Sequence, residues 1–260
     1  MICVGIDGGS RAIKIVLMDA ESGEAVAKGV RDQGVDHDRL ARDLFDDLLE
    51  NAGIRRDEVA RIVATGYTRN GITLADTTVT EITCHAVGVR HVAPAARTVI
   101  EVGGQDAKLL RLTPEGGVRD FAMNDRCAAG TGRFLEMVAQ RLDTDLEGLG
   151  DLADRAEAPA AVSSMCVVFA ETEIIGLLAS GERPADIVAG VQRAIASRVA
   201  GMLGRQVVPP VVFTGGVALV PGMADAVAEA VGTEVQVVPE PQMSGALGAA
   251  ILACREARAG

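Results

Sequence analysis

Tryptophan is absent from the 260-residue sequence, and aromatic residues together make up only 2% of it. A core must therefore be built from aliphatic side chains, which the hydrophobic content of 48% supplies. Basic residues are also scarce, since 25 Lys and Arg stand against 36 Asp and Glu, for a formal net charge of -11. Nucleic-acid-binding proteins concentrate positive charge to neutralise phosphates, so we expect no DNA or RNA partner.

Long apolar runs are missing as well. No segment reaches the roughly 18 apolar residues that a membrane helix needs, and the first residues show no basic stretch followed by an apolar run. We expect a soluble, cytoplasmic protein that does not bind a membrane. The cysteines form no closely spaced pairs, and their odd number is unlike the disulfide framework of an exported protein.

The order of the expected elements repeats along the chain. Short apolar runs at residues 2–7 and 13–18, joined by GGSRA, predict a hairpin, and residues 36–53 and 59–66 predict a helix and a strand. A similar order begins at residue 98 with TVIEVGGQDAKLLRL, a strand near VRDFAMN and the helix GTGRFLEMVAQRL. The remaining expected elements are helices near 166–179, 184–203, 221–231 and from 243, and strands at 211–216 and EVQVV.

This repetition predicts an α/β fold of two related lobes with a nucleotide cleft between them. We assign residues 1–97 to an N-terminal lobe, which the C-terminal helix 243–260 joins, and residues 98–242 to a C-terminal lobe.

Two glycine turns, DGGS at residues 7–10 and GGQD at residues 103–106, are candidate phosphate loops. Without a Cβ atom, glycine lets backbone N–H groups approach an anion closely. Asp7 and Asp106 are candidates to hold Mg2+ or to orient an attacking water, and Ser10 and Lys14 to contact phosphate oxygens. Either turn alone is more often an ordinary hairpin turn.

A third stretch, VVFTGGVALVPGM at residues 211–223, ends a strand in Gly215 and Gly216 and leads to a helix expected to open at Pro221. Such an arrangement lets the backbone lie against a nucleoside. An ordinary strand-to-helix connection is the alternative.

Two cysteines stand near expected helix starts. Cys127 precedes a Gly-Thr-Gly step in FAMNDRCAAGTGRFLEM, and Cys166 follows Ser163 and Ser164, the candidate N-caps of the next helix. The N–H groups of a helix N-terminus should lower the pKa of both thiols and favour the metal-binding thiolate.

An iron–sulfur cube needs four such ligands, which two symmetric chains would provide. A transient Cys127–Cys166 disulfide and a shared zinc ion remain alternatives. We assign structural or surface roles to the other cysteines and to the histidines: Cys3, Cys84, Cys254, His37, His85 and His91.

Taken together, the three glycine motifs resemble the phosphate-1, phosphate-2 and adenosine motifs of the acetate kinase, sugar kinase, Hsp70 and actin superfamily, whose fold has two ribonuclease-H-like lobes. The closing stretch QMSGALGAAILA resembles the final helix of that superfamily, which would place Gln242 and Ser244 near the nucleotide. Close helix packing is the alternative explanation of its small residues.

Five segments, MNDRCAAGTGRFLE, SSMCVVFAETE, EVGGQDAK, EITCHAVG and TGGVA, resemble the activators of 2-hydroxyacyl-CoA dehydratases, in the ATPase family that also contains benzoyl-CoA reductase subunits. The resemblance implies a homodimer with one 4Fe-4S cluster held by Cys127 and Cys166 of both chains. It also implies Mg2+-dependent ATP hydrolysis to ADP, and transfer of an electron from ferredoxin or flavodoxin to the dehydratase.

The same resemblance assigns the site residues. The catalytic residues would be Asp7, Gln105 and Asp106. The nucleotide would contact Gly8, Gly9, Ser10, Arg11, Ala12, Ile13, Lys14, Gly103, Gly104, Gly130, Thr131, Gly132, Gly215, Gly216 and Gln242. Two residues depart from the family pattern: Arg11 replaces a small or hydroxyl residue, and Met165 replaces a small polar one.

Other functions fit the same motifs. Within the family these are the ATPase subunit of a benzoyl-CoA-reductase-like complex and a reductase of another iron–sulfur protein. Outside it, a small-molecule kinase or an actin-like or Hsp70-like ATPase would leave the two cysteines without a role.

Overall fold

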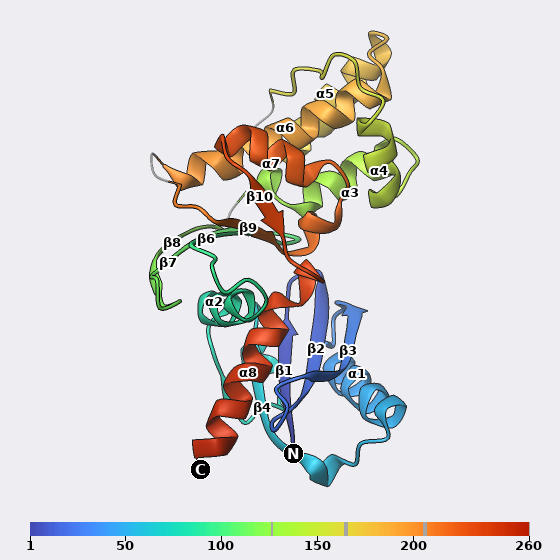
Figure 1. Cartoon of the computed structure of the whole chain (residues 1–260). Coiled ribbons are helices and arrows are strands. Elements are labelled where there is room, and N and C mark those ends of the chain that lie inside the picture. Colours follow the sequence, from blue (N-terminus) through green and yellow to red (C-terminus); the bar gives the residue numbers. More distant parts are fainter. Residues whose placement is uncertain (126, 164–165, 205–206, 260) are drawn as a thin grey trace. The chain divides into compact units, whose positions relative to one another are not determined.

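The computed structural model describes residues 1–125, 127–163, 166–204 and 207–259 (Figure 1). The chain divides into two compact units, each built on a five-stranded sheet. Unit 1 comprises Met1–Ala95, Thr113–Val118 and Gln242–Gly260, and unit 2 comprises Ala96–Leu112 and Arg119–Pro241. Unit 2 is continuous in sequence except for residues 113–118, the tip of the β7–β8 hairpin, which belong to unit 1. Unit 1 is otherwise assembled from the first and last parts of the given sequence.

The sheet of unit 1 has the order β3-β2-β1-β4-β5. Strand β1 pairs antiparallel with β2 and parallel with β4. Its side chains are buried on both faces of the sheet, which explains the unbroken apolar run at the start of the sequence. The strands are β1 Ile2–Gly8, β2 Ala12–Asp19, β3 Ala25–Asp32, β4 Val59–Thr65 and β5 Thr77–Thr78.

Helices cover the sheet of unit 1 through two separate apolar clusters. Alternate residues of β1, such as Val4 and Ile6, pack with helix α1 (His37–Ala52), while Cys3 packs with α8 (Ser244–Ala259). Helix α8 also contacts α2 (Glu81–Val92). Short 3-10 turns η1 (Arg56–Glu58) and η2 (Arg69–Gly71) complete the unit, and η5 (Pro241–Met243) spans the point in the sequence where unit 2 ends and unit 1 resumes.

The small residues of α8 permit close backbone contact with its neighbours. A Cβ atom on Gly248 would lie 1.8 Å from the carbonyl oxygen of Cys84 in α2, and one on Gly88 would lie 2.0 Å from the carbonyl oxygen of Ser244. On the sheet side, a Cβ atom on Gly5 would lie 2.0 Å from the carbonyl oxygen of Ala246. Close packing therefore accounts for the small residues along this helix.

Replacing Gly248 by alanine is expected to lower the free energy of unfolding by about 2–3 kcal/mol, because the added methyl group must push apart two backbones. Urea unfolding followed by circular dichroism measures this change. Gly201→Ala in helix α6 is the matched control, since among the described residues no atom outside the helix's own backbone lies within 4 Å of the position that its methyl group would take. That change is expected to raise stability by up to about 1 kcal/mol, and equal effects at both sites would contradict the packing argument.

The sheet of unit 2 has the order β10-β9-β6-β7-β8. Its strands are β6 Thr98–Val102, β7 Ala107–Leu112, β8 Val118–Asn124, β9 Val211–Thr214 and β10 Val235–Val237. Its helices are α3 Gly132–Arg141, α4 Leu146–Ala153, α5 Val167–Ala179, α6 Pro184–Leu203 and α7 Met223–Val231, with 3-10 turns η3 Ala128–Gly130 and η4 Gly216–Leu219.

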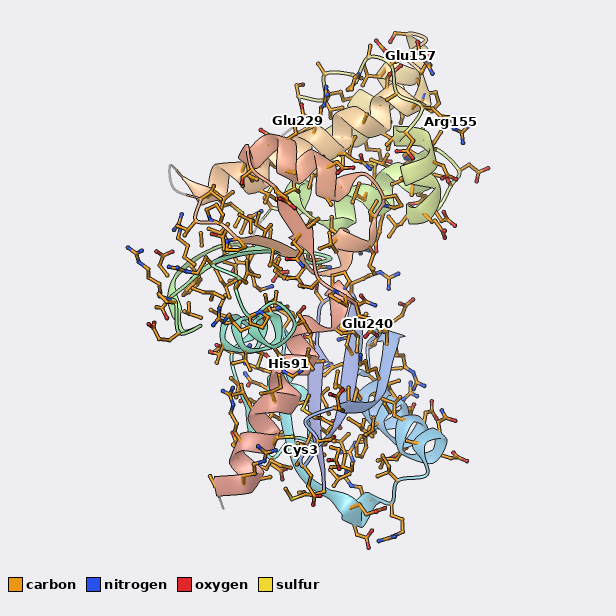
Figure 2. All side chains as sticks on the ribbon, viewed as in Figure 1. Cys3, His91, Arg155, Glu157, Glu229 and Glu240 are labelled. Carbon is orange, nitrogen blue, oxygen red and sulfur yellow. The ribbon has the colours of Figure 1, made fainter. Side chains whose placement is uncertain are left out.

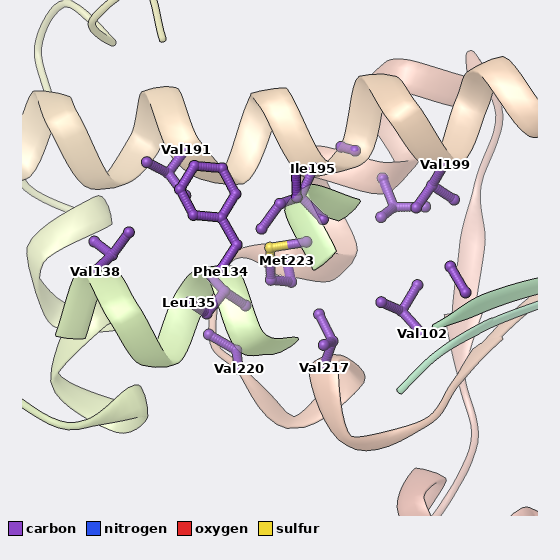
Figure 3. Close-up of a cluster of buried hydrophobic side chains, with 14 of the residues drawn as sticks. Val102, Phe134, Leu135, Val138, Val191, Ile195, Val199, Val217, Val220 and Met223 are labelled. Atoms are coloured by element: carbon purple, nitrogen blue, oxygen red, sulfur yellow. The ribbon is translucent and has the colours of Figure 1, made fainter. Parts of the chain in front are cut away.

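One apolar cluster holds unit 2 together (Figure 3). Phe134 of α3 points between Val191 and Ile195 of α6, and Met223 of α7 lies beside them. Because α6 has a buried residue on nearly every turn, it forms the centre against which the other helices pack.

Most elements expected from the sequence are present within a few residues of their predicted ends. Four elements, β3, β5, α2 and α4, are not predicted by the sequence pattern, and the first part of the chain runs β-β-β-α-β rather than the expected β-β-α-β. Strand β3 was not predicted because none of its side chains is fully buried: half-buried and exposed residues alternate along it. It also contains Gly29, whose missing side chain makes room for Leu44 and Leu48 of α1.

Two expected helix starts are wrong. Helix α7 begins at Met223 after Gly222, and Pro221 instead packs against Gly150 of α4. Ser163 is not the N-cap of α5; its N–H and hydroxyl groups both donate to Glu173, and Cys166 occupies the N-cap position. Ser164, the other N-cap candidate, and Met165 lie outside the described residues. None of the helices in the described part of the chain is long and apolar enough to cross a bilayer.

Candidate functional site

The first glycine turn connects β1 to β2 and places a carboxylate opposite a lysine. Asp7 faces Lys14 across the hairpin, and Lys14 Nζ lies 3.2 Å from Asp7 Oδ2. The turn is closed by the Gly9 N–H, which donates to the Ala12 carbonyl at 3.1 Å. A Cβ atom on Gly9 would lie 2.9 Å from the carbonyl oxygen of Ala12, so the closed backbone of the turn favours glycine at this position.

Two glycines that lie far from this turn in the sequence, and were not predicted site residues, enclose Asp7. Gly66 has a φ of 91°, and a Cβ atom on it would lie 2.4 Å from Asp7 Oδ1. A Cβ atom on Gly245 would lie 3.1 Å from Asp7 Oδ2. The glycine directly after the apolar run of β4 was the available signal for the first of these.

The second glycine turn, between β6 and β7, repeats this construction in unit 2. Glu101 faces Lys108 across the hairpin, with 2.9 Å between Lys108 Nζ and Glu101 Oε2. The Gly103 N–H closes the turn by donating to the Asp106 carbonyl at 2.9 Å. Lys108 is only 3% exposed, and its Nζ also lies 2.6 Å from Asp106 Oδ2.

The hydrogen bonds of the two turns show which residues correspond. Glu101 is the structural counterpart of Asp7, Lys108 that of Lys14, and Asp106 that of Ala12. The Gly-Gly pairs beside Asp7 and Asp106 suggest that these two aspartates correspond, but the strand register pairs Asp7 with Glu101 instead, and Glu101 and Lys108 were not predicted site residues. The signal that finds them is the equal spacing of acid and lysine, seven residues apart in both hairpins.

Three of the predicted loops meet within unit 2. The N–H groups of Gly132 and Arg133, at the start of α3, donate to the carbonyls of Gly103 and Gly104 at 2.9 Å each. Gly215, at the end of β9, has a φ of 90°, and a Cβ atom on it would lie 2.8 Å from Glu101 Oε1. The start of α3 therefore fixes the β6–β7 turn. Because these two N–H groups donate to carbonyls of the protein, they are already hydrogen-bonded without a ligand.

The remaining predicted contacts differ in their surroundings. The guanidinium of Arg11 forms an ion pair with Asp32 at 2.9 Å, and Gln105 is exposed at the tip of its turn. The side chain of Ile13 is fully buried among apolar residues, so only its backbone is available to a ligand. The side-chain oxygen of Gln242 is buried and has no hydrogen-bond partner among the described residues.

Cys127 is half-buried and heads η3 rather than α3, which starts five residues later. The Asn124 amide holds it in place: its nitrogen donates to the Cys127 carbonyl at 3.0 Å, and its oxygen accepts from the Cys127 N–H at 3.2 Å. Turn η3 packs against both α3 and α6.

Cys166 is exposed at the N-cap of α5, a helix that packs against the same two helices, α3 and α6. The chain leading to it is tied to α6, since the N–H groups of Glu157 and Ala158 donate to the buried carboxylate of Asp186 at 2.8 and 2.7 Å (Figure 2 labels Glu157). Next to the cysteine, Val168 and Phe169 are 69% and 72% exposed.

The other three cysteines lie in the interior of unit 1, as expected. Burial raises the pKa of the Cys3 and Cys84 thiols to about 12, and it also raises the pKa of Cys254 (Figure 2 labels Cys3). These thiols remain protonated at neutral pH. Within the described residues of one chain, no three His, Cys, Asp or Glu side chains are grouped to hold a metal ion.

Comparison with known proteins gives consistent matches over the whole chain. The BadF/BadG/BcrA/BcrD ATPase family matches residues 4–253. The activator of lactoyl-CoA dehydratase from Anaerotignum propionicum is 43% identical, over 99% of each chain. The (R)-2-hydroxyglutaryl-CoA dehydratase activating ATPase from Acidaminococcus fermentans is 42% identical, over 98% of this chain and 97% of the relative.

Solved structures agree with these relatives. The activator of the 2-hydroxyisocaproyl-CoA dehydratase from Clostridium difficile, with bound ADPNP, has a TM-score of 0.94 at 38% identity and covers 100% of this chain and 96% of its own. A ROK family glucokinase from Streptomyces griseus has a TM-score of 0.61 at 14% identity, covering 100% of both chains. The second likeness concerns the fold alone and confirms the α/β fold of the sugar kinase type.

Proposed function

Because the chain belongs to the BadF/BadG/BcrA/BcrD ATPase family, we propose that it is an ATP-hydrolysing activator of a 2-hydroxyacyl-CoA dehydratase. In this proposal it passes an electron, received from ferredoxin or flavodoxin, to the dehydratase. The names of its most similar relatives, which activate dehydratases of this type, support the assignment.

The repeated hairpin supports phosphate binding by both glycine turns. Each turn contains a Gly-Gly pair, whose backbone can approach a phosphate because it carries no side chains. Each turn also has a carboxylate that forms an ion pair with a lysine. Asp7 and Glu101 are the carboxylates that we assign to Mg2+ or to an attacking water. Asp106, which shares Lys108 with Glu101, is a further candidate. Gly215 and Gly216 would face the nucleoside.

We assign the 4Fe-4S cluster to Cys127 and Cys166 of two chains. The thiols fit this role because they are the accessible ones, each at the start of a helical turn, while the other three are buried and protonated. When bound, such a cluster supplies a one-electron carrier at the protein surface. One chain offers too few thiolates, so a two-fold pair of chains must complete the set.

The surface around Cys166 supports the homodimer. Val168, Phe169 and Ile175 of α5 expose half or more of their surface, and α5 buries only Ala170 and Ile174. A helix that is apolar on nearly all sides is stable in water when another surface covers it. A second copy, related by a two-fold axis that brings its Cys166 to the same cluster from the opposite side, would cover it.

Helix α3 links the β6–β7 turn to Cys127, and we propose that it transmits the structural change caused by ATP hydrolysis to the cluster. Its first N–H groups bind the carbonyls of the β6–β7 turn, and η3, headed by Cys127, packs directly against it. A change of phosphate contacts at this turn would therefore shift the helix that supports Cys127, because rigid helices transmit small displacements.

Anaerobic purification followed by iron and sulfide analysis tests this function. We expect a brown dimer with about four iron atoms per dimer, ATPase activity, and ATP-dependent reduction of a partner dehydratase. A colourless, metal-free protein that hydrolyses ATP would reject the redox role. ATP-dependent phosphorylation of a small molecule by such a protein would support the kinase alternative instead.

A further inference from the structure

Two carbonyl groups of the β1–β2 turn accept hydrogen bonds from residues outside the turn. The Gly9 carbonyl accepts from the Gln33 amide nitrogen at 2.8 Å. The Gly8 carbonyl accepts from the N–H of Thr68 at 2.8 Å and from its hydroxyl at 3.2 Å. Gln33 and Thr68 thus bind consecutive carbonyls of the turn that carries the proposed phosphate contacts.

The orientation of the Gln33 amide is itself fixed. Its oxygen accepts from the Gly34 N–H at 3.2 Å, which leaves the amide nitrogen to face Gly9, and the Gln33 backbone N–H donates to the Arg11 carbonyl at 3.0 Å. The residue follows β3, the edge strand of the sheet, so its position depends on the pairing of β3 with β2.

The hydrogen bond from Gln33 to the Gly9 carbonyl sets the direction of the Ser10 N–H group. In a planar trans peptide the C=O and N–H point in opposite directions, so the Ser10 N–H points away from Gln33. Without this bond the peptide between Gly9 and Ser10 is free to turn over, because glycine accepts either orientation. The turned peptide would present a carbonyl oxygen where the N–H had been, and an oxygen repels an anion.

We propose that Gln33 is a positioning residue for phosphate binding: by holding the Gly9 carbonyl it keeps the Ser10 N–H directed at the phosphates of the nucleotide. The proposal rests on the phosphate role assigned to this turn. Donors that are oriented before the ligand arrives bind it more tightly than donors that must reorient.

The test measures the affinity of the full-length protein for ADPNP and for adenosine by isothermal titration calorimetry. Gln33→Glu keeps the shape of the side chain but replaces the amide donor by an oxygen that repels the Gly9 carbonyl. We expect affinity for ADPNP to fall roughly 10- to 100-fold and affinity for adenosine to stay within about twofold. Gln33→Ala should lower ADPNP affinity by a smaller factor, and it replaces Gln33→Glu if the latter does not fold.

Two further variants make the result decisive. Gln236→Glu, on the exposed strand β10, controls for the added negative charge and should leave both affinities unchanged. Lys14→Met, at the proposed phosphate site, should weaken ADPNP binding. If Lys14→Met weakens binding and both Gln33 variants do not, Gln33 has no positioning role and the phosphate site stands. If neither residue matters, both proposals fail, and equal losses for adenosine and ADPNP would show a general structural role instead.

Discussion

Cys166→Ala and Cys127→Ala are each expected to abolish cluster binding, with iron and sulfide falling at least about tenfold below the wild-type protein. Each substitution removes two of the four thiolates of a cluster shared by two chains, because the same residue is lost from both. Metal affinity depends steeply on a complete ligand set. Anaerobic iron and sulfide analysis, together with the visible absorption of the purified protein, measures the loss.

Cys254→Ala is the matched control for this experiment. It removes a thiol from the interior of unit 1, where burial keeps the thiol protonated, so iron content should match the wild type even if stability falls slightly. Retention of iron in either Cys127 or Cys166 variant would show that these residues do not hold the cluster. ATP affinity should be unaffected in all three variants, which separates metal loss from unfolding.

Lys108→Met is expected to lower the free energy of unfolding by about 3–5 kcal/mol, the usual cost of removing one partner from a buried ion pair. The loss leaves Glu101 buried without the cation that now lies 2.9 Å away, and Asp106 loses its contact at 2.6 Å. Chemical unfolding by urea at neutral pH measures the change.

Two variants accompany this measurement. Lys28→Met, on the exposed face of β3, removes the same charge from the surface and should change stability by no more than about 1 kcal/mol, the usual upper limit for an exposed ion pair. The double variant Lys108→Met with Glu101→Gln should recover part of the loss, because the neutral amide no longer needs a counterion. No recovery would mean that the packing of the lysine chain, and not its charge, stabilises the hairpin.

The sequence allowed the fold to be predicted where the apolar pattern was strong. Helices α1 and α6 and the two central hairpins appear where their periodicity placed them. Helix α4 was missed because two glycines interrupt its pattern; one of them, Gly150, is required by the contact with Pro221, which lies about seventy residues further along. Such a requirement comes from tertiary packing and leaves no local signal.

The candidate site was predictable to a similar degree. Glycine turns, acidic residues and the accessible cysteines could be found from local motifs. The correspondence of Glu101 with Asp7, and the supports provided by Gln33, Thr68 and Gly66, depend on strand register and on contacts between distant segments. Local motifs consist of residues adjacent in the sequence, so the two Gly-Gly pairs are recognisable as motifs. The acid and the lysine of each hairpin are seven residues apart and are brought together only by strand pairing.

The packing of α8 on β1 has a consequence for the order of folding during synthesis. Strand β1 is synthesised before unit 2, yet the helix that covers one of its faces is synthesised after unit 2. Unit 2 is nearly continuous in sequence and is complete before α8 emerges. The apolar surface around Cys3 and Val16 therefore stays uncovered by α8 while unit 2 is synthesised, and during that time it is open to intermolecular association.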